Sequence, residues 1–404
     1  MKRLRAGINS RLLFSPSLRG FNRYAVNLLT ELSNQGVELV LYSDRPLYAG
    51  HLERLRPGSY TVHVSNPMPY LFWEQDWLPR QCAAHGVDVL HSPFNFGLPW
   101  RSRCPRVLTL HDAIDYVYYR PKMRWSEKLH PDHLKTCIYH WVARTRAHQV
   151  ITVSEHAKSE IVRYLKVPPG KISVIYEGAD PYFNRPASDE MIVQIREKHD
   201  LDRPYFFYVG GWEKRKNLPF LLRAFAKAAL EDVDLVLSGA KEEQRAEMMK
   251  LAAALGIQER VRFLGWVLDE DLLPLYAGSL AFAHPSEHEG FGLQLCEAMA
   301  AHCPVLAARA TSLPEVLGSG GETFALGDEG EELSGLLQRV ARDSAYRLSL
   351  VERARMRSGQ LSWRRTAEQT AAVYWRAIGR SPAGGDLLPE RNAPAAARGL
   401  QEAD

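Results

Sequence analysis

The sequence predicts an α/β protein with two Rossmann-like domains, each a parallel sheet covered by helices on both faces. At 404 residues the chain is longer than one compact core usually supports, so two domains are expected. Short, almost continuously apolar runs alternate with longer segments of helical period, which is typical of buried parallel strands between helices. The alternation occurs once in each half of the chain, so each half is expected to form one domain.

Apolar runs of strand length occur in both halves. In the first half they are residues 4–8, 37–42, 87–90, 106–110, 149–153 and 171–176. In the second half they are residues 205–209, 234–237, 261–264, 280–283 and 304–307. Helical periodicity lies between many of them, for example over residues 24–34, 218–230, 244–255 and 294–301.

The domain limits follow from composition. Residues 1–185 are expected to form the first domain and residues 200–361 the second, because the segment 178–203 between them is rich in turn formers. Ser362 is a suitable helix cap, so residues 362–380 are expected to form a last amphipathic helix. Residues 381–404 are rich in Pro, Ala and Gly and are expected to be disordered.

Composition excludes several classes of protein. A net charge of +4 is too weak to indicate nucleic acid as a partner. No apolar run reaches the roughly 18 residues of a membrane span, and the N-terminus turns polar too early for a signal peptide. The five cysteines form no C-x-x-C pair, which indicates reduced thiols rather than disulfides or structural zinc. A soluble, cytoplasmic protein is expected.

Polar residues follow two strands of the first domain. Ligands of open α/β sheets collect beyond the carboxyl ends of the strands, here at a crevice between the domains. His111 and Asp112 follow the run 106–110, and a histidine can donate to a substrate hydroxyl or a phosphate. A packed His and a capping Asp are the structural alternative. Ser154 and Glu155 follow the run 149–153 and are equally explained as a helix cap and a first-turn residue.

A short glycine turn with three cations follows the first strand of the second domain. Gly210 and Gly211 allow close backbone approach, and the cations Lys214, Arg215 and Lys216 can neutralise phosphate at a helix start. A solvated basic turn is an equally good interpretation. The segment matches neither G-x-G-x-x-G nor G-x-x-x-x-G-K-[ST], which disfavours NAD and P-loop chemistry.

Two glutamates seven residues apart flank the start of a helix late in the second domain. Glu289 precedes Gly290, Phe291 and Gly292, and Glu297 lies on the helix that follows. Carboxylates accept hydrogen bonds from vicinal hydroxyls and glycines expose backbone amides, so the segment suits a sugar joined to a phosphate. Alternatively, Glu297 is a surface residue and Glu289 a partner of the helix dipole. No H-x3-H or H-E-x-x-H spacing occurs, so no metal site is expected.

Together these segments resemble the retaining glycosyltransferases of family 4, from Gly20 to about Ala377. That family has the GT-B fold, in which two Rossmann-like domains face each other across a cleft and a C-terminal helix crosses back to the first domain. Glu289 and Glu297 match its E-x7-E motif, and Lys216 stands in the place of its phosphate-binding lysine.

Other motifs match less completely. His111 matches the acceptor-domain histidine, and the segment 311–316 matches the loop near the nucleotide diphosphate. Gly20 is alone where family members often have several glycines. Gly211 stands where many members have a phosphate-binding arginine, for which Arg215 is a substitute.

The resemblance implies transfer of a hexose from GDP-mannose or a UDP-sugar, with retention, to a glycan or lipid-linked acceptor in surface-polysaccharide synthesis. It implies a donor site on the second domain, an acceptor site on the first, and no metal or other cofactor. The implied catalytic residues are His111 and Glu289. The implied donor-binding residues are Gly20, Gly210, Gly211, Arg215, Lys216, Gly290, Phe291, Gly292, Glu297, Ser312 and Leu313. The implied acceptor-side residues are Asp112, Ser154 and Glu155.

Two alternatives remain open at this point. A sugar-nucleotide epimerase of the same fold would release an isomerised sugar without an acceptor. A non-catalytic carbohydrate-binding protein would carry a decayed site, although the joint presence of Glu289, Glu297 and Lys216 argues against decay.

A basic and aromatic stretch over residues 116–146 predicts peripheral docking on an anionic membrane surface. Cations contribute about 1 kcal/mol each near such a surface, and aromatic rings suit the interface. A solvated helix face with core aromatics is the alternative. The stretch carries seven cations against Glu127 and Asp132: Arg120, Lys122, Arg124, Lys128, Lys135, Arg144 and Arg146.

Overall fold

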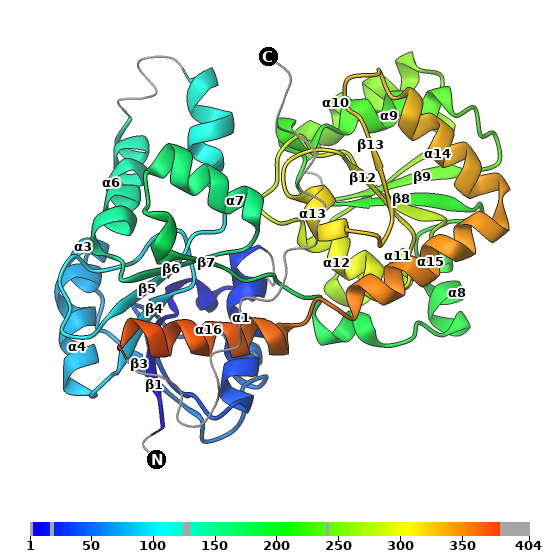
Figure 1. Ribbon diagram of the computed structural model, residues 1–404. Helices are drawn as coiled ribbons and strands as arrows, with labels where there is room; N and C mark the ends of the chain where they lie inside the picture. Colours follow the sequence, from blue (N-terminus) through cyan, green and yellow to red (C-terminus); the bar gives the residue numbers. More distant parts are fainter. Residues whose placement is uncertain (1–2, 17–19, 124–129, 240–241, 380–404) are drawn as a thin grey trace.

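The computed structural model describes residues 3–16, 20–123, 130–239 and 242–379, of which the side chains of 131–133 and 242 are not described. Within these residues the strands form two parallel sheets, one in each lobe of the molecule (Figure 1). The strand order is β3-β2-β1-β4-β5-β6-β7 in the first sheet and β10-β9-β8-β11-β12-β13 in the second. The two-domain α/β class is therefore confirmed.

The first lobe contains the N-terminal elements. Its strands are β1 (Arg5–Asn9), β2 (Glu38–Ser43), β3 (Tyr60–Val64), β4 (Val89–Ser92), β5 (Arg106–Thr109), β6 (Gln149–Thr152) and β7 (Ile172–Val174). Its α-helices are α1 (Phe21–Asn34), α2 (Ala49–Leu52), α3 (Tyr70–Phe72), α4 (Leu78–Ala84), α6 (Pro131–Arg146) and α7 (Glu155–Glu160).

The second lobe contains the remaining strands and most of the remaining helices. Its strands are β8 (Tyr205–Val209), β9 (Asp234–Ser238), β10 (Val261–Gly265), β11 (Ala281–His284), β12 (Val305–Ala308) and β13 (Glu322–Phe324). Its α-helices are α8 (Asp189–Lys198), α9 (Leu218–Lys227), α10 (Glu242–Ala254), α11 (Asp269–Ala277), α12 (Leu293–Ala300), α13 (Leu313–Leu317), α14 (Glu331–Arg342) and α15 (Ser344–Ser358).

The apolar runs predicted as strands all form strands, within about two residues at each end. Two strands, β3 and β13, were not predicted. Both lie at the edge of a sheet, and neither is fully buried. An edge strand needs no continuous apolar run, because one side of it faces solvent or loops. The turn-rich segment 178–203 also contains α8, whose N-cap Ser188 accepts a hydrogen bond from the amide of Met191.

Each sheet reverses its strand order at one point, between β1 and β4 in the first lobe and between β8 and β11 in the second. A crevice opens at the carboxyl ends of the strands where the order reverses, and ligands of such sheets bind there. The loops that follow β8 and β11 therefore occupy the position where a ligand of the second domain is expected.

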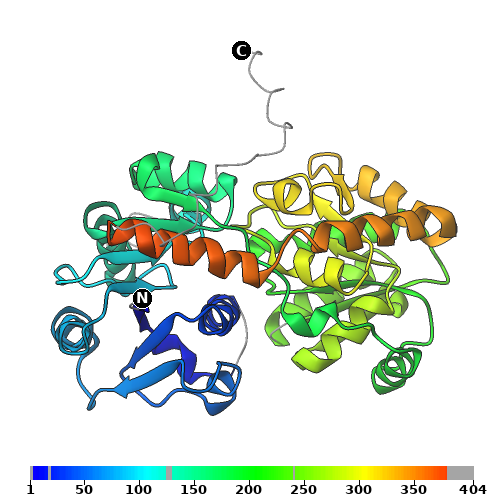
Figure 2. The same ribbon diagram turned by 60° about the horizontal axis from the view of Figure 1, so that its bottom comes forward.

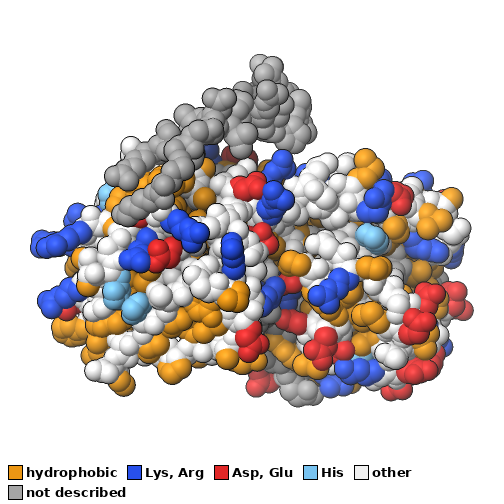
Figure 3. Space-filling model, turned by 90° about the horizontal axis from the view of Figure 1, so that it is seen from below, with side chains coloured by type: hydrophobic (Ala, Val, Ile, Leu, Met, Phe, Trp, Pro, Cys, Tyr) orange, Lys and Arg blue, Asp and Glu red, His pale blue; other side chains and the backbone are white. Residues whose placement is uncertain are grey.

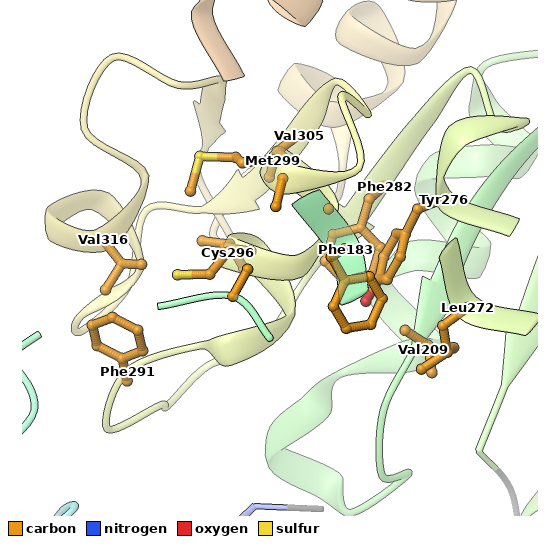
Figure 4. Close-up of a cluster of buried hydrophobic side chains, with 14 of the residues drawn as sticks. Phe183, Val209, Leu272, Tyr276, Phe282, Phe291, Cys296, Met299, Val305 and Val316 are labelled. Atoms are coloured by element: carbon orange, nitrogen blue, oxygen red, sulfur yellow. The ribbon is translucent and has the colours of Figure 1, made fainter. Parts of the chain in front are cut away.

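The central strands are buried on both faces, and aromatic rings fill the space between sheet and helices (Figure 4). In the second lobe the ring of Tyr276 lies 5.3 Å from that of Phe282 and 6.0 Å from that of Phe183. Burying one large apolar side chain contributes about 1.5–3 kcal/mol. This core gives the loops at the crevice a rigid base.

The last described helix, α16 (Trp363–Ala377), crosses back and packs on the first domain (Figure 2). Ser362 caps it by accepting from the amide of Arg365, as predicted. The Tyr374 hydroxyl lies 2.7 Å from Nδ1 of His91, and Thr366 donates to the carbonyl of Tyr176. The predicted crossing is therefore confirmed, whereas the tail predicted for 381–404 lies outside the described residues.

Two further expectations concern composition. All five cysteines are free thiols. Among the helices of the described chain, none combines the length and apolar character that crossing a bilayer requires.

Candidate active site

A largely buried cluster of one carboxylate and two cations lies beyond the carboxyl ends of β8 and β11, in the second domain. After β8 the chain forms the 3-10 helix Lys214–Lys216, and Glu289 lies in the loop after β11. Nζ of Lys216 is 2.6 Å from Oε1 of Glu289, and Nη1 of Arg215 is 3.0 Å from Oε2. Nε2 of His284 is 3.3 Å from Oε1. The structure thus joins the predicted phosphate-binding cations to the first glutamate of the motif.

The pKa values of this cluster keep it charged. Burial opposes ionisation of Glu289, but Lys216, His284 and Arg215 together hold its pKa well below the usual value. Burial likewise disfavours the charged Arg215, yet Glu289 raises the pKa of Arg215. Lys216 and Arg215 each carry one positive charge and Glu289 carries one negative charge, so the three side chains together leave one net positive charge. This arrangement can accept an anionic group such as a diphosphate.

The loop 289–292 is held in shape by the start of α13. Oγ of Ser312 donates to the carbonyls of Glu289 and Phe291, and the Leu313 side chain contacts Gly292. Phe291 is itself buried in the core beside Val316 (Figure 4). Ser312, Leu313 and Phe291 therefore support the loop, and their side chains do not line an open surface.

Gly290 brings the loop 289–292 against the first domain. A Cβ at this position would lie 2.4 Å from the carbonyl oxygen of His111, so only glycine fits there. Oγ of Ser154 donates to the carbonyl of Gly290 at 2.7 Å and also caps α7 by accepting from the amide of Ala157. The cap predicted for Ser154 is confirmed, and the same side chain joins the two domains.

Contacts with residues of the first domain hold the ring of His111 in place. Nε2 of His111 lies 3.1 Å from the carbonyl of Pro93, and Nδ1 lies 3.6 Å from Oε1 of Glu177. The ring of Tyr24 packs edge-on at 4.5 Å. Burial raises the pKa of the neighbouring Asp112. His111 therefore has a fixed orientation beside Gly290.

The second glutamate of the motif has entirely different partners. Glu297 lies on α12 and pairs through Oε1 with Arg23 of α1, in the first domain. Oε2 of Glu297 accepts from the hydroxyl of Tyr276 at 3.2 Å, and Arg23 also lies 2.8 Å from Oδ1 of Asp269. Burial raises the pKa of Glu297, although Arg23 opposes this shift. Both carboxylate oxygens of Glu297 therefore have partners within the protein.

Gly20 affects the site indirectly, through the start of helix α1. It is the N-cap of α1 and has a φ of +47°, a region that favours glycine. Arg23 follows within the first turn of that helix. Gly20 therefore helps to set the start of the helix that carries Arg23 to Glu297.

The remaining predicted residues contribute through their backbones. The amide of Gly210 donates to the carbonyl of Ser238 at 3.3 Å, and the carbonyl of Gly211 accepts from the Tyr208 hydroxyl. These two glycines therefore form the turn that follows β8. The side chain of Glu155 is exposed, and only its backbone takes part in an interdomain contact.

Several residues of this interface were not predicted from the sequence. Glu315 of α13 accepts hydrogen bonds from the amides of Glu155 and His156 and from the hydroxyl of Tyr176. It therefore caps α7 of the other domain, which faces α13 in Figure 1. Arg23 could have been suspected, because it is the only charged residue in the first nine positions of α1. The capping role of Glu315 has no local signal.

Comparison with known proteins covers both lobes. Residues 18–183 match Glycosyltransferase Family 4, and residues 192–357 match Glycosyl transferases group 1. The O-antigen chain mannosyltransferase B of Escherichia coli is 31% identical over 294 residues, which are 71% of this chain and 74% of the relative. The MMP alpha-(1->4)-mannosyltransferase of Mycolicibacterium hassiacum is 33% identical over 236 residues, 57% of this chain and 55% of the relative.

Solved structures show the same fold at low sequence identity. A glycosyltransferase from Rickettsia africae superposes with a TM-score of 0.73 at 16% identity, covering 94% of this chain and all of the other. HepE of Anabaena, solved in complex with UDP and glucose, gives a TM-score of 0.71 at 19% identity over 91% of this chain and 98% of HepE. The GT-B arrangement is therefore confirmed.

Proposed function

The chain belongs to glycosyltransferase family 4, and on that premise we propose that it moves a hexose, with retention, from a nucleotide-diphosphate sugar to a glycan or lipid-linked acceptor in surface-polysaccharide synthesis. Mannose is the first candidate sugar, because the relatives at 31% and 33% identity are mannosyltransferases. GDP-mannose and the UDP-sugars are the donors to test. The observation that carries the proposal is the buried Lys216–Glu289–Arg215 cluster, which lies at the carboxyl end of β8 and packs through Gly290 against His111.

In this proposal the diphosphate binds Lys216 and Arg215. Both cations are paired with Glu289; Lys216 is buried, and the side chain of Arg215 is 18% exposed. A diphosphate brings negative charge to the same two cations, which allows Glu289 to turn toward the transferred sugar. Charge that develops on the leaving phosphate is then met by groups already in place.

No divalent metal is required for the reaction in this proposal. Two buried cations at one crevice supply the positive charge that a metal ion supplies in other phosphate-transfer sites. No side chain is assigned as a nucleophile, and the leaving phosphate helps to deprotonate the acceptor. His111 and Asp112 lie on the first-domain side of Gly290, where the acceptor is expected, and His111 would orient its hydroxyl.

A panel of donors tests the proposal directly. Purified protein is mixed with GDP-mannose, other GDP-sugars and UDP-sugars, and the thermal midpoint is followed for each. Only the true donor should raise the midpoint strongly, since a ligand that binds the folded state stabilises it by mass action. Release of an isomerised sugar in the absence of acceptor would instead identify an epimerase. If no nucleotide sugar raised the thermal midpoint, the proposed function would be refuted.

We further propose that the lipid-linked acceptor is reached by docking on an anionic bilayer through helices α3 and α6. Nζ of Lys135 on α6 lies 5.5 Å from the ring centre of Tyr70 on α3, so the two helices are neighbours. The first-domain lobe, on the left of Figure 3, carries apolar side chains with Lys and Arg at its outer edge. The exposed large apolar side chains of these helices are Leu71, Phe72, Leu134, Ile138 and Trp141.

The docking surface differs in part from the one predicted. Arg124, Trp125, Glu127 and Lys128 lie outside the described residues. Tyr139 is half-buried and packs on the ring of Phe96 at 5.6 Å, so it belongs to the fold and not to the surface. The exposed cations that remain on α6 are Lys135, Arg144 and Arg146.

Co-sedimentation with vesicles tests docking. The protein should bind vesicles of phosphatidylglycerol but not of phosphatidylcholine, and salt should weaken the binding. Phe72→Ser should reduce binding, whereas Leu348→Ser, which removes an equally exposed apolar side chain from α15 of the other domain, should not. Equal losses in the two variants, or no binding to anionic vesicles, would leave a soluble acceptor as the better proposal.

A further inference from the structure

A second cluster of polar side chains joins the two domains beside the cation cluster. His156 and Glu160 lie one turn apart on α7 of the first domain, and His288 lies in the β11–α12 loop, directly before Glu289. Nε2 of His156 is 3.1 Å from Oε1 of Glu160, and Nε2 of His288 is 2.8 Å from the same oxygen. One ligand atom from each residue lies within 4.8 Å of the other two.

The spacing of these three atoms fits a metal ion. Zinc bound by histidine nitrogens and carboxylate oxygens at about 2.0–2.2 Å in tetrahedral geometry places its ligand atoms about 3.3–3.5 Å apart. The contacts of 3.1 and 2.8 Å to Oε1 of Glu160 therefore need to lengthen by about 0.2–0.7 Å. Histidine side chains of this kind move that far by small rotations, without a change in the backbone.

The carboxylate of this cluster is not fully satisfied by hydrogen bonds. Glu160 is buried, at 7% exposure, yet no Lys or Arg of the described residues forms a salt bridge with it. Its second oxygen, Oε2, has no hydrogen-bond partner within the described chain. A buried carboxylate oxygen without a partner is costly, and a cation coordinated through both oxygens of Glu160 would supply one.

The orientation of His288 is also compatible with metal binding. Its Nε2 faces Glu160, whereas Nδ1 is buried and has no partner among the described residues. A neutral imidazole that coordinates through Nε2 carries its proton on Nδ1. The carbonyl of His288 accepts from Nη1 of Arg215, which fixes the backbone of this residue. The ring of His288 therefore projects from a backbone that a hydrogen bond fixes in place.

We propose that His156, Glu160 and His288 bind a zinc-class divalent cation that clamps α7 of the first domain to the loop carrying Glu289. Two histidines and one glutamate are a donor set that zinc, cobalt and nickel prefer, and three protein ligands leave a coordination position for water. The site does not take part in the chemistry of sugar transfer. It requires the two domains in the arrangement seen here, so bound metal favours that arrangement.

The consequence is a metal that stabilises the enzyme and slows it. A donor or a product must pass the interface between the domains, and a clamp next to Glu289 opposes their separation. Bound zinc is therefore expected to raise the thermal midpoint and to lower turnover at saturating substrate. Removal of the metal should restore turnover, which separates this site from a catalytic metal.

Cobalt binding provides the direct test, because it needs no activity measurement. Metal-free protein titrated with Co²⁺ should develop the visible absorption of four-coordinate cobalt at one equivalent, and Zn²⁺ should displace it. His288→Ala and Glu160→Gln should each weaken binding at least tenfold. His302→Asn removes an exposed histidine from the other end of α12, at a position with φ of +58° that asparagine tolerates, and should change nothing.

A second measurement keeps the proposal open to refutation if a variant folds poorly. Hydrogen exchange of α7 and of residues 285–292 in the unmodified protein should slow when zinc is added, and His302→Asn should behave identically. Cobalt spectra typical of six-coordinate ions bound to exposed histidines, or binding that survives both His288→Ala and Glu160→Gln, would overturn the proposal. So would zinc binding without any change of exchange at the interface.

Discussion

Glu289 and Glu297 belong to one motif, yet their surroundings differ. Lys216, Arg215 and His284, which contact the carboxylate of Glu289, all come from its own domain, and the cluster can persist when the domains separate. Glu297 depends on Arg23 from the other domain. The comparison indicates that the second domain alone positions Glu289, whereas the partners of Glu297 are complete only when the two domains are in contact.

The largest effect is expected from Arg23→Met. Removing one partner of a buried ion pair costs about 3–5 kcal/mol, unless the remaining charge reaches water. Domain opening gives Glu297 that access, so the variant should adopt a more open arrangement, seen as a larger radius of gyration and faster hydrogen exchange in α12. Tyr276→Phe, which removes only a contact within the second domain, is the control. Unchanged exchange in Arg23→Met would refute the distinction between the two glutamates.

Lys216→Ala should damage catalysis most. Loss of one group that stabilises developing negative charge lowers kcat by about 10²–10³, or roughly 2.7–4 kcal/mol. Lys214→Ala is the matched control, because Lys214 is an exposed cation on the same short helix. Steady-state kinetics with the identified donor measures both variants. Equal kcat values for Lys216→Ala and the unmodified enzyme would mean that Lys216 does not meet the diphosphate.

The two glutamates are expected to differ in nucleotide binding. Glu297→Ala should weaken binding of the free nucleoside diphosphate, because a hydrogen bond between a carboxylate and a ribose hydroxyl contributes about 1.5–3 kcal/mol. Glu289→Ala should spare this binding and impair transfer, since Lys216 and Arg215 remain. Calorimetry with the diphosphate and a transfer assay separate the two effects. Equal affinities in the two variants would show that the division of roles is incorrect.

Acidification should affect the two glutamates in opposite directions. The pKa of Glu289 lies well below 4.5, so its contribution to stability is present above that pH and is lost as pH falls. The pKa of Glu297 is raised, so the cost of burying its charge is relieved as pH falls through the raised value. Glu289→Gln should flatten the acid loss of stability and Glu297→Gln should steepen it, because each tenfold difference in proton affinity between the folded and unfolded states is worth about 1.4 kcal/mol. Urea unfolding between pH 7 and pH 2 measures the slopes, because the loss that involves Glu289 occurs below pH 4.5, and a change of the same sign in both variants would contradict the assignment.

The smallest effect is expected from metal removal. Because Lys216 and Arg215 supply the positive charge, excess EDTA should leave turnover unchanged or slightly higher. Initial rates in EDTA, compared with rates after addition of manganese, check this point. If activity disappeared in EDTA and returned with manganese, the metal-free mechanism would be wrong.

Local patterns in the sequence were sufficient for most of the fold. A strand buried on both faces must be apolar throughout, so runs such as 205–209 and 234–237 are recognisable wherever they occur. The edge strands β3 and β13 escaped prediction because they need only half of that pattern. The caps Ser154 and Ser362 were also predictable, because a cap acts on amides within one turn.

The sequence by itself determined which residues follow each strand, and therefore that Lys216 and Glu289 lie at one crevice. Only the tertiary structure decided which charges meet across the domains. Arg23 and Glu297 are 274 residues apart, and Glu160 and His288 are 128 residues apart. Neither pair has a spacing that a helix or strand period could indicate, because their contact depends on how two separately folded domains are placed. Local periodicity carries information about one element and its neighbours, whereas an interdomain contact depends on the packing of both domains and of α16 across them.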